Sequence, residues 1–169
     1  NALLAVAVAA EAGLGRDEIR RGLAACQPPP MRMQVWSAGG ITVLDDAYNA
    51  NADSMLAALQ TLKDFPCRGR RIAVLGAMKE LGSQSAGLHA SLAEPIEEAK
   101  IDCAILVGEE MAPLAERLEG KLALAHVADV ISAQEKLTSD VRAGDVILVK
   151  GSNSVGLSRL VAALADGER

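Results

Sequence analysis

Apolar residues follow two alternating patterns along most of this chain. Unbroken apolar runs of strand length stand at 72–75, 103–107 and 146–149; residues 41–44, with Thr42 among them, also have the pattern of a buried strand, and a shorter strand is expected near 122–125. Runs without a polar break are typical of parallel strands that are buried on both faces. Between these runs, apolar residues recur at helical spacing over about 53–64, 84–99, 110–118, 130–141 and 156–165. The alternation predicts an α/β fold of three layers, a mostly parallel sheet with helices on both faces.

The first third of the chain departs from this alternation. Residues 2–12 and about 16–26 have the pattern of two helices, and the three prolines at 28–30 then prevent a helix from continuing. Residues 33–37 and 41–45 flank Gly39 and Gly40, and paired glycines favour a tight hairpin turn. We therefore expect a helical segment at 1–27, a proline-rich hinge at 28–32 and an α/β domain at 33–169 that opens with an antiparallel edge. Because Asn1 stands in mid-helix, we expect this chain to be part of a longer protein.

Composition narrows the class of protein. Half of the residues are hydrophobic but only 2% are aromatic, so the core has to be built from Ala, Val, Leu and Ile. A net charge of -5 and a pI near 5.1 argue against a nucleic-acid-binding protein, because phosphate neutralisation needs clustered Lys and Arg. The apolar stretch near the start is too short to span a membrane. Three widely spaced cysteines without a C-x-x-C pair favour reduced thiols and a cytoplasmic location.

A dense polar segment follows the first apolar run of the α/β pattern. Asp45 and Asp46 come at its carboxyl end, the edge where open α/β sheets bind ligands. Adjacent carboxylates repel each other unless a cation or ligand meets them, so the pair is a candidate for chelating a metal, binding ribose hydroxyls or capping the next helix. Tyr48 is either a core ring or a plate for a nucleotide base. Asn49 and Asn51 also suit an ordinary turn and a helix N-cap.

Two further positions carry candidate chemistry. Lys150 and Ser152 follow the strand at 146–149 and precede a helix, where a cation, a hydroxyl and backbone N–H groups can stabilise an anion. An ordinary strand-to-helix turn explains them equally well. Arg32, just after the prolines, is either a surface charge or a phosphate ligand beside an interdomain cleft. Neither the G-x-G-x-x-G nor the Walker A pattern occurs, and the two histidines, His89 and His126, are too isolated to suggest a metal site.

Taken together, these motifs resemble the C-terminal domain of Mur ligases. The resemblance rests on Pro-x-Arg-Met at 30–33, Asp-Asp-x-Tyr-Asn-Ala-Asn-x-x-Ser-Met at 45–55, Val-Leu-Gly-x-Met-x-Glu-Leu-Gly at 74–82 with a downstream Ser and His, and Val-x-Leu-Val-Lys-Gly-Ser at 146–152. Within that family the chain is most similar to members that add D-alanyl-D-alanine to UDP-N-acetylmuramoyl-tripeptide in bacterial peptidoglycan synthesis. Three positions depart from the family pattern: Ala52 in place of Pro, Ala77 in place of Asp and Asn153 in place of Arg.

The resemblance implies an ATP-dependent ligase with a Rossmann-like C-terminal domain. The substrate carboxylate would be phosphorylated by ATP, and the amine of the dipeptide would attack the acyl phosphate. The enzyme's N-terminal and central domains, absent from this chain, would carry the UDP-sugar site, the P-loop and the Mg²⁺ ligands, and 1–27 would be the end of the central domain. The residues that the resemblance assigns to nucleotide binding are Asn1, Arg32, Asp45 or Asp46, and Tyr48. It assigns Asn49 and Asn51 to substrate binding and Lys150 and Ser152 to the reacting centre, with no metal ligand in this chain. The fragment alone is expected to be inactive.

Two alternatives remain. Another Mur-type or folylpolyglutamate-type ligase domain would share the fold, although a His-containing motif is expected there in place of Tyr48 to Asn51. A phosphoacceptor signalling module also combines an acidic pair with a later lysine after a strand. That reading lacks an aspartate to phosphorylate, because Leu75-Gly76-Ala77 ends the second strand.

Overall fold

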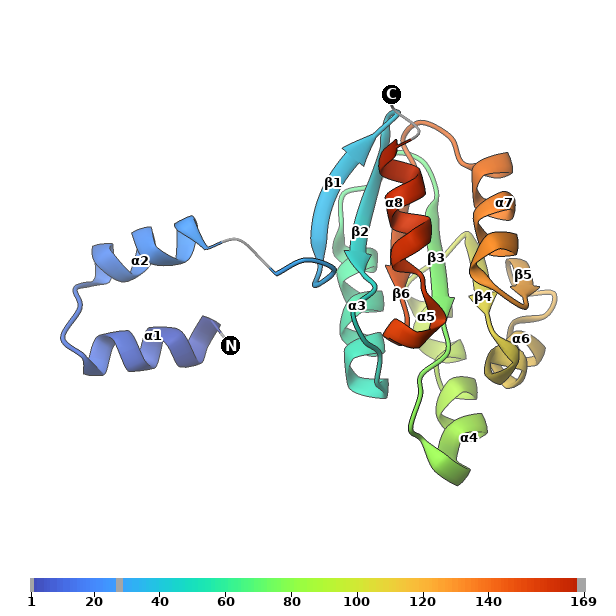
Figure 1. The fold of residues 1–169 in the computed structure, drawn as a ribbon, viewed down its shortest axis with the longest axis horizontal. Coiled ribbons are helices and arrows are strands. Elements are labelled where there is room, and N and C mark those ends of the chain that lie inside the picture. The colour runs from blue at the N-terminus through green and yellow to red at the C-terminus, as the bar shows by residue number, and fades with distance from the viewer. Residues whose placement is uncertain (1, 27–28, 167–169) are drawn as a thin grey trace.

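A computed structural model describes residues 2–26 and 29–166 of the chain. Its centre is a six-stranded sheet in the order β1-β2-β6-β3-β4-β5 (Figure 1). The strands are β1 (Gln34–Ala38), β2 (Ile41–Asp46), β3 (Arg71–Gly76), β4 (Cys103–Val107), β5 (Ala123–Val127) and β6 (Val146–Lys150). Only β1 is antiparallel to its neighbour, and it joins β2 through the Gly39-Gly40 turn. The mostly parallel sheet with an antiparallel edge is therefore confirmed.

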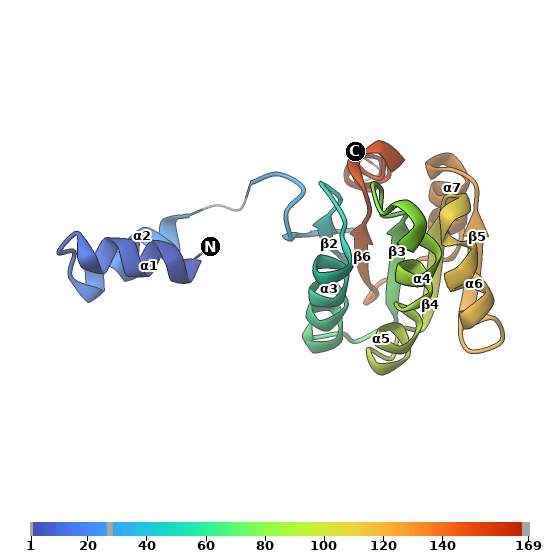
Figure 2. The same ribbon diagram turned by 90° about the horizontal axis from the view of Figure 1, so that it is seen from below.

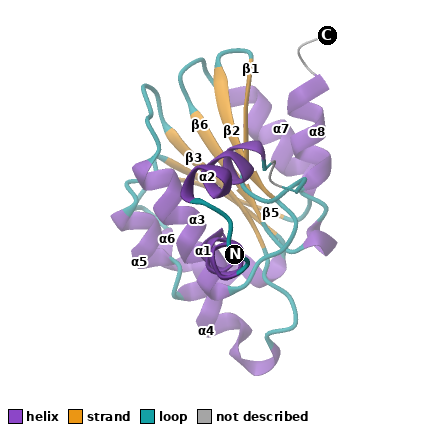
Figure 3. Ribbon diagram, turned by 90° about the vertical axis from the view of Figure 1, so that its left-hand side faces the viewer, coloured by secondary structure: helices purple, strands orange, loops and turns teal. Residues whose placement is uncertain are grey.

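Helices cover both faces of this sheet, as Figures 2 and 3 show. The helices of the sheet domain are α3 (Ala52–Asp64), α4 (Ser85–Ala90), α5 (Ala93–Glu98), α6 (Ala112–Leu118), α7 (Val130–Asp140) and α8 (Ser158–Asp166). Alternate strand residues face the two sides: Leu44, Leu75 and Leu148 pack under α3 to α6, whereas Val43, Val74 and Val149 pack under α7 and α8. Burial of both faces is why the runs at 72–75 in β3, 103–107 in β4 and 146–149 in β6 lack polar breaks.

One expected helix is divided in two. The pattern over 84–99 predicts a single helix, but the chain forms α4 and α5 with a break at Ser91 and Leu92. Pro95 explains the break, because proline has no N–H to donate to the carbonyl four residues earlier and its ring would clash with that carbonyl. The expectation of a continuous helix was wrong. Short 3-10 turns also precede α4, α6 and α8, at Gly82–Gln84, Glu109–Met111 and Asn153–Val155.

The segment before the sheet consists of α1 (Ala2–Glu11) and α2 (Arg16–Ala25), which form a helical hairpin drawn apart from the sheet in Figure 1. Several of its apolar side chains are exposed, including Leu3, Leu4 and Val8. Among the described residues, none of the helices is long and apolar enough to cross a bilayer. The boundaries expected at 1–27, 28–32 and 33–169 stay predictions, and residues 1, 27 and 28 lie outside the described part of the chain.

An ion-pair network ties the strands together at the amino edge of the sheet. The Arg70 guanidinium lies 2.7 Å from the Asp145 carboxylate and 2.9 Å from that of Asp140. Asp145 is buried and also accepts the backbone N–H groups of Arg70 and Arg142. Burial raises the pKa of Asp145, but the bonds from Arg70 and these N–H groups outweigh it, so the pKa is lowered overall. A lowered pKa means that the folded state favours the charged carboxylate.

We expect Arg70→Met to lower the free energy of unfolding by about 2 kcal/mol, because it leaves the Asp145 charge buried without its main partner. The matched control is Lys121→Met, which breaks the exposed pair between Lys121 and Glu97 and should cost less than about 1 kcal/mol. Urea unfolding at neutral pH measures both. Since the pKa of Asp145 is depressed, its contribution persists above 3.8 and is lost as the pH falls through the lower folded value. Equal losses in the two variants would contradict the assignment.

Candidate functional site

The carboxyl ends of β2 and β6 bring two of the predicted residues together. The register pairs Asp46 directly with Lys150, and the Lys150 ammonium lies 2.5 Å from the Asp46 carboxylate. Lys150 also donates to the backbone oxygen of Asn49 at 2.9 Å. With 2% of its surface exposed, Lys150 is one of the largest fully buried side chains. The lysine is therefore held as a structural cation beneath the loop that follows β2.

The acidic pair is split between the two faces of the sheet. Asp46 lies on the side of α3, where Lys150 meets it, whereas Asp45 is buried beside the opposite core and accepts the N–H of Ala47. Burial raises the pKa of Asp45; the bond from Ala47 lowers it in part, and the charge of Asp46 raises it further. The repulsion expected between adjacent carboxylates is thus reduced by a cation on one of them and by separation across the backbone.

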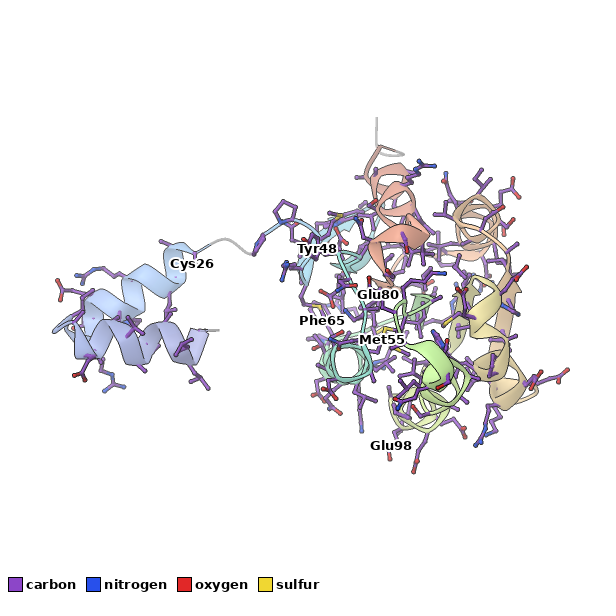
Figure 4. The ribbon with its side chains drawn as sticks, turned by 60° about the horizontal axis from the view of Figure 1, so that its bottom comes forward. Cys26, Tyr48, Met55, Phe65, Glu80 and Glu98 are labelled. Atoms are coloured by element: carbon purple, nitrogen blue, oxygen red, sulfur yellow. The ribbon has the colours of Figure 1, made fainter. Side chains whose placement is uncertain are left out.

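The segment after the prolines is bonded to the same strand end. Met33 donates its N–H to the other Asp46 oxygen at 3.0 Å, and Tyr48 donates its N–H to the oxygen of Met31 at 3.1 Å. The Arg32 guanidinium lies 4.2 Å from the centre of the Tyr48 ring, a cation–π contact. Tyr48 is 44% exposed, which excludes the core-ring alternative. Figure 4 shows Tyr48 on the side of the sheet domain where the linker from α2 arrives.

These groups enclose a pocket of about 370 Å³ at the carboxyl edge. Its lining combines Arg32, Asp46, Tyr48 and Lys150 with Met33, Asn49, Ala50, Asn51 and Ser54. Asn51 caps α3: its side-chain oxygen accepts the N–H of Ser54, and its own N–H donates to the Ser54 hydroxyl. Asn49 bonds to the N–H of Ala50. The capping alternative is therefore correct for Asn51, which still faces the pocket.

Ser152 stands in the turn after β6, beside rather than inside this pocket. It is buried, its hydroxyl lies 3.2 Å from that of Ser154, and its N–H donates to the oxygen of Ala77. The turn packs tightly on β3, since a Cβ at Gly151 would come within 2.9 Å of the Gly76 Cα. Glycine is required here by close approach of two backbones. Asn1, assigned to the nucleotide, lies outside the described residues.

A second recess of about 510 Å³ opens at the ends of β3, β4 and β5. Its charged lining is Lys79, Glu109, Glu110 and Asp129, and Lys79 forms an ion pair with Glu110. That pair lowers the pKa of the Glu110 carboxyl. No role was predicted for these residues from the sequence, although Lys79 and Glu110 each stand within three residues of a strand end. That position at the carboxyl edge was the available signal.

His89, dismissed as a metal ligand by its isolation, is completely buried beside this edge. Its Nε2 accepts the N–H of Met78 at 2.9 Å, and its Nδ1 lies 2.8 Å from the oxygen of Ser85. His126 lies on β5, with its Nε2 2.8 Å from the oxygen of Gly108. Within residues 2–26 and 29–166, no group of three or more His, Cys, Asp or Glu side chains is arranged to hold a metal ion.

The arrangement suits binding and orientation of a polar, charged ligand. The first pocket is lined by an aromatic face, a guanidinium and a carboxylate with unused lone pairs. The second recess is lined by side chains of both positive and negative charge. Both pockets open at the carboxyl edge of the sheet. Open α/β sheets bind ligands at this edge, where the helices that follow neighbouring strands pack on opposite faces. We find no paired nucleophile and base among these described side chains.

Comparison with known proteins gives the relatives of this chain. A curated relative, the UDP-N-acetylmuramoyl-tripeptide--D-alanyl-D-alanine ligase of Mycobacterium leprae, is 40% identical across 99% of this chain and 36% of its own length. A crystal structure of MurF from Acinetobacter baumannii matches 98% of this chain and 37% of its own, with a TM-score of 0.84 and 28% identity. MurF from Thermotoga maritima in complex with ADP matches 94% and 35%, with a TM-score of 0.78 and 27% identity.

The chain thus spans a little over a third of the length of these relatives. The family model described as "Mur ligase, glutamate ligase domain" matches residues 31–153, which include β1 to β6, the whole lining of the first pocket and most of the lining of the second recess. The chain belongs to the Mur ligase family and contains its glutamate ligase domain.

Proposed function

We propose that this chain is the C-terminal part of an ATP-dependent ligase that joins D-alanyl-D-alanine to UDP-N-acetylmuramoyl-tripeptide during bacterial peptidoglycan synthesis. The relatives that carry this name support the reaction, and the Thermotoga protein, whose structure contains ADP, supports the use of a nucleotide. We place that nucleotide at the pocket near Tyr48. Because the reaction consumes ATP and a nucleotide-linked precursor, we propose a cytoplasmic location. Residues 1–27 would end the central domain, 28–32 would form the hinge and 33–169 the C-terminal domain.

One observation carries this proposal: a cation, a carboxylate and an aromatic ring line one pocket at the carboxyl edge of the sheet, which we propose is half of a nucleotide site. Arg32, Asp46 and Tyr48 supply a cation, a carboxylate and an aromatic face, which suit the phosphates, the ribose hydroxyls and the base. Asp46 uses one lone pair of each oxygen for Met33 and Lys150, which leaves others for hydroxyl donors. Asp45 lies on the opposite face, so we assign the ribose to Asp46. Asn1 is retained as a proposed adenine neighbour.

The second recess suits the incoming dipeptide, which is a zwitterion. The Lys79 ammonium can bind its carboxylate, and the carboxylates of Glu110 and Asp129 can attract its amine. The recess borders the turn that holds Ser152, which we propose lies beside the reacting centre together with Lys150, Asn49 and Asn51. The dipeptide amine would then be presented toward the first pocket.

This chain would contribute orientation and charge to the reaction. Holding the dipeptide amine close to the acyl phosphate makes the attack effectively unimolecular. Hydrogen-bond donors in fixed positions stabilise the charge that develops in the transition state. Bound Mg²⁺ would neutralise the ATP phosphates, and we propose, as the family resemblance implies, that the preceding central domain supplies its ligands. The other partners are the UDP-linked tripeptide and the enzyme's N-terminal and central domains.

The reaction itself is tested with the full-length enzyme. We expect it to release phosphate from ATP and form the amide only when both the UDP-linked tripeptide and D-alanyl-D-alanine are present. The 169-residue chain alone should show no turnover, because it contains no Walker A loop to hold the phosphates. Phosphate release coupled to mass spectrometry of the product measures both. Turnover by the isolated chain, or an equal rate with another amine, would contradict the proposal.

Asp46→Asn in the full-length enzyme should raise the KM for ATP by about 10-fold, because one uncharged amide oxygen replaces the two charged oxygens of the carboxylate and weakens the bonds to the ribose hydroxyls. Asp45→Asn is the matched control. It keeps an acceptor for the Ala47 N–H and removes a buried charge, so we expect stable folding and a KM within about 2-fold of the original. Steady-state kinetics with varied ATP gives both values.

Asp46→Asn also leaves the buried Lys150 charge without its partner, so stability has to be separated from binding. Adding Lys150→Met to Asp46→Asn removes that charge and should restore the melting temperature toward the original value. The KM for ATP should stay high in the double variant. If it returns to the original value together with stability, Asp46 does not bind the nucleotide.

Lys79→Met should raise the KM for D-alanyl-D-alanine by about 10-fold, since it removes a charge-assisted bond to the dipeptide carboxylate. The KM for ATP should change by less than about 2-fold, because Lys79 lies in the other recess. Lys136→Met, an exposed lysine on α7, is the control and should change neither constant. Equal increases for ATP and dipeptide would place Lys79 outside the dipeptide site.

A further inference from the structure

His89 joins two segments that the chain separates. Its Nε2 accepts the Met78 N–H, so that nitrogen has to be unprotonated. The Nδ1 then carries the hydrogen and donates it to the Ser85 oxygen at 2.8 Å. The partners thus select the neutral Nδ1–H tautomer. The imidazole connects the loop after β3 to the first turn of α4, and it is completely buried while doing so.

The loop held by His89, residues 77–82, borders the proposed dipeptide recess. Ala77 is already fixed by two backbone bonds, one to Val107 on β4 and one from Ser152 after β6. Met78 is the next residue, and its N–H finds its acceptor in His89. Lys79 follows at once and extends into the recess, and Glu80 then turns the chain with a φ of 64°. Three successive residues therefore connect β4, the turn after β6, α4 and the recess.

The bond to Met78 fixes where the Lys79 side chain begins. A buried N–H needs an acceptor, and no regular backbone ladder supplies one at this point of the loop. An apolar side chain at 89 would fill the same volume but leave that N–H unpaired, which favours a different loop conformation. The charged groups around the ring are Glu110, from the turn after β4, and Lys79 itself.

We propose that His89 is a positioning residue of the ligase, which holds the 77–82 loop so that Lys79 faces the dipeptide and Ser152 keeps its place at the reacting centre. The inference rests on the proposed function for the identity of the ligand. The connection between His89 and the loop rests on geometry alone. It gives a chemical role, that of a neutral acceptor for one backbone N–H, to a side chain that lines neither pocket.

Two variants separate the acceptor from the volume of the side chain. His89→Gln places an amide oxygen near the position of Nε2 and can accept the Met78 N–H, whereas His89→Leu cannot. In the full-length enzyme, His89→Leu should raise the KM for D-alanyl-D-alanine by about 10-fold and that for ATP by less than about 2-fold. His89→Gln should stay within about 3-fold for both. Leu137→Ala, a destabilising change in the core on the opposite face, should alter neither constant once the folded fraction is measured.

Amide hydrogen exchange on the 169-residue chain tests the connection without any assay of activity. The Met78 amide should exchange at least about 10-fold faster in His89→Leu and keep its protection in His89→Gln and Leu137→Ala. Burial lowers the pKa of His89 below 6.5, with the Ser85 bond and Glu110 acting in the opposite direction. Protection of Met78 should therefore be complete above pH 6.5 and decline as the pH falls through the lower folded value, because a protonated ring cannot accept.

Each outcome decides a separate question. Unchanged exchange at Met78 in His89→Leu overturns the connection between His89 and the loop. Faster exchange with an unchanged KM for the dipeptide makes His89 structural only and also overturns the proposal. A full-length enzyme that does not use D-alanyl-D-alanine contradicts the proposed function, while the exchange data still decide whether His89 holds the loop.

Discussion

A carboxylate and an ammonium, both largely withdrawn from water, hold the working edge of this sheet together. Asp46 ends β2 and Lys150 ends β6, and their contact joins the first and last strands of the parallel set. Burying either charge alone would be unfavourable, so each stabilises the position of the other. Asp46 also receives the N–H of Met33 and Lys150 binds the oxygen of Asn49. The pocket beside them is therefore shaped before any ligand arrives.

The same edge is organised by backbone contacts at a second place. Ala77 stands where related sequences usually have aspartate, and its side chain is wholly buried. The backbone of Ala77 makes its polar contacts: its N–H donates to the Val107 oxygen, and its oxygen accepts the N–H of Ser152. The next N–H, that of Met78, donates to His89. The second recess is thus bordered by one short loop that contacts β4, the turn after β6 and α4. The position of Lys79 in the recess therefore depends on backbone contacts outside the recess.

The sequence predicts the layers of sheet and helices, but it does not predict which side chains of the site contact each other. The apolar runs identify β2, β3, β4 and β6, and the polar residues after them are expected at one edge. That Asp46 meets Lys150 follows from strand order and register, which the periodicity of either segment does not contain. The partner of His89 is a backbone N–H, which has no signature in a sequence, so isolation from other ligands was uninformative. Pro95, by contrast, was a visible signal for the break between α4 and α5, because its missing N–H interrupts a helix of any composition.

The backbone on either side of Arg32 has a consequence for domain movement. Met31 and Met33 both have positive φ, at 58° and 51°, a conformation that side chains other than glycine seldom adopt. The bonds from Tyr48 to Met31 and from Met33 to Asp46 keep them there. A change in the direction of α1 and α2 relative to the sheet would then be made by torsions before Met31. Arg32 and Tyr48 would then move with the sheet as one body, which narrows the proposed hinge to the part of 28–32 that precedes Met31. The proposed nucleotide pocket would keep its shape during that movement.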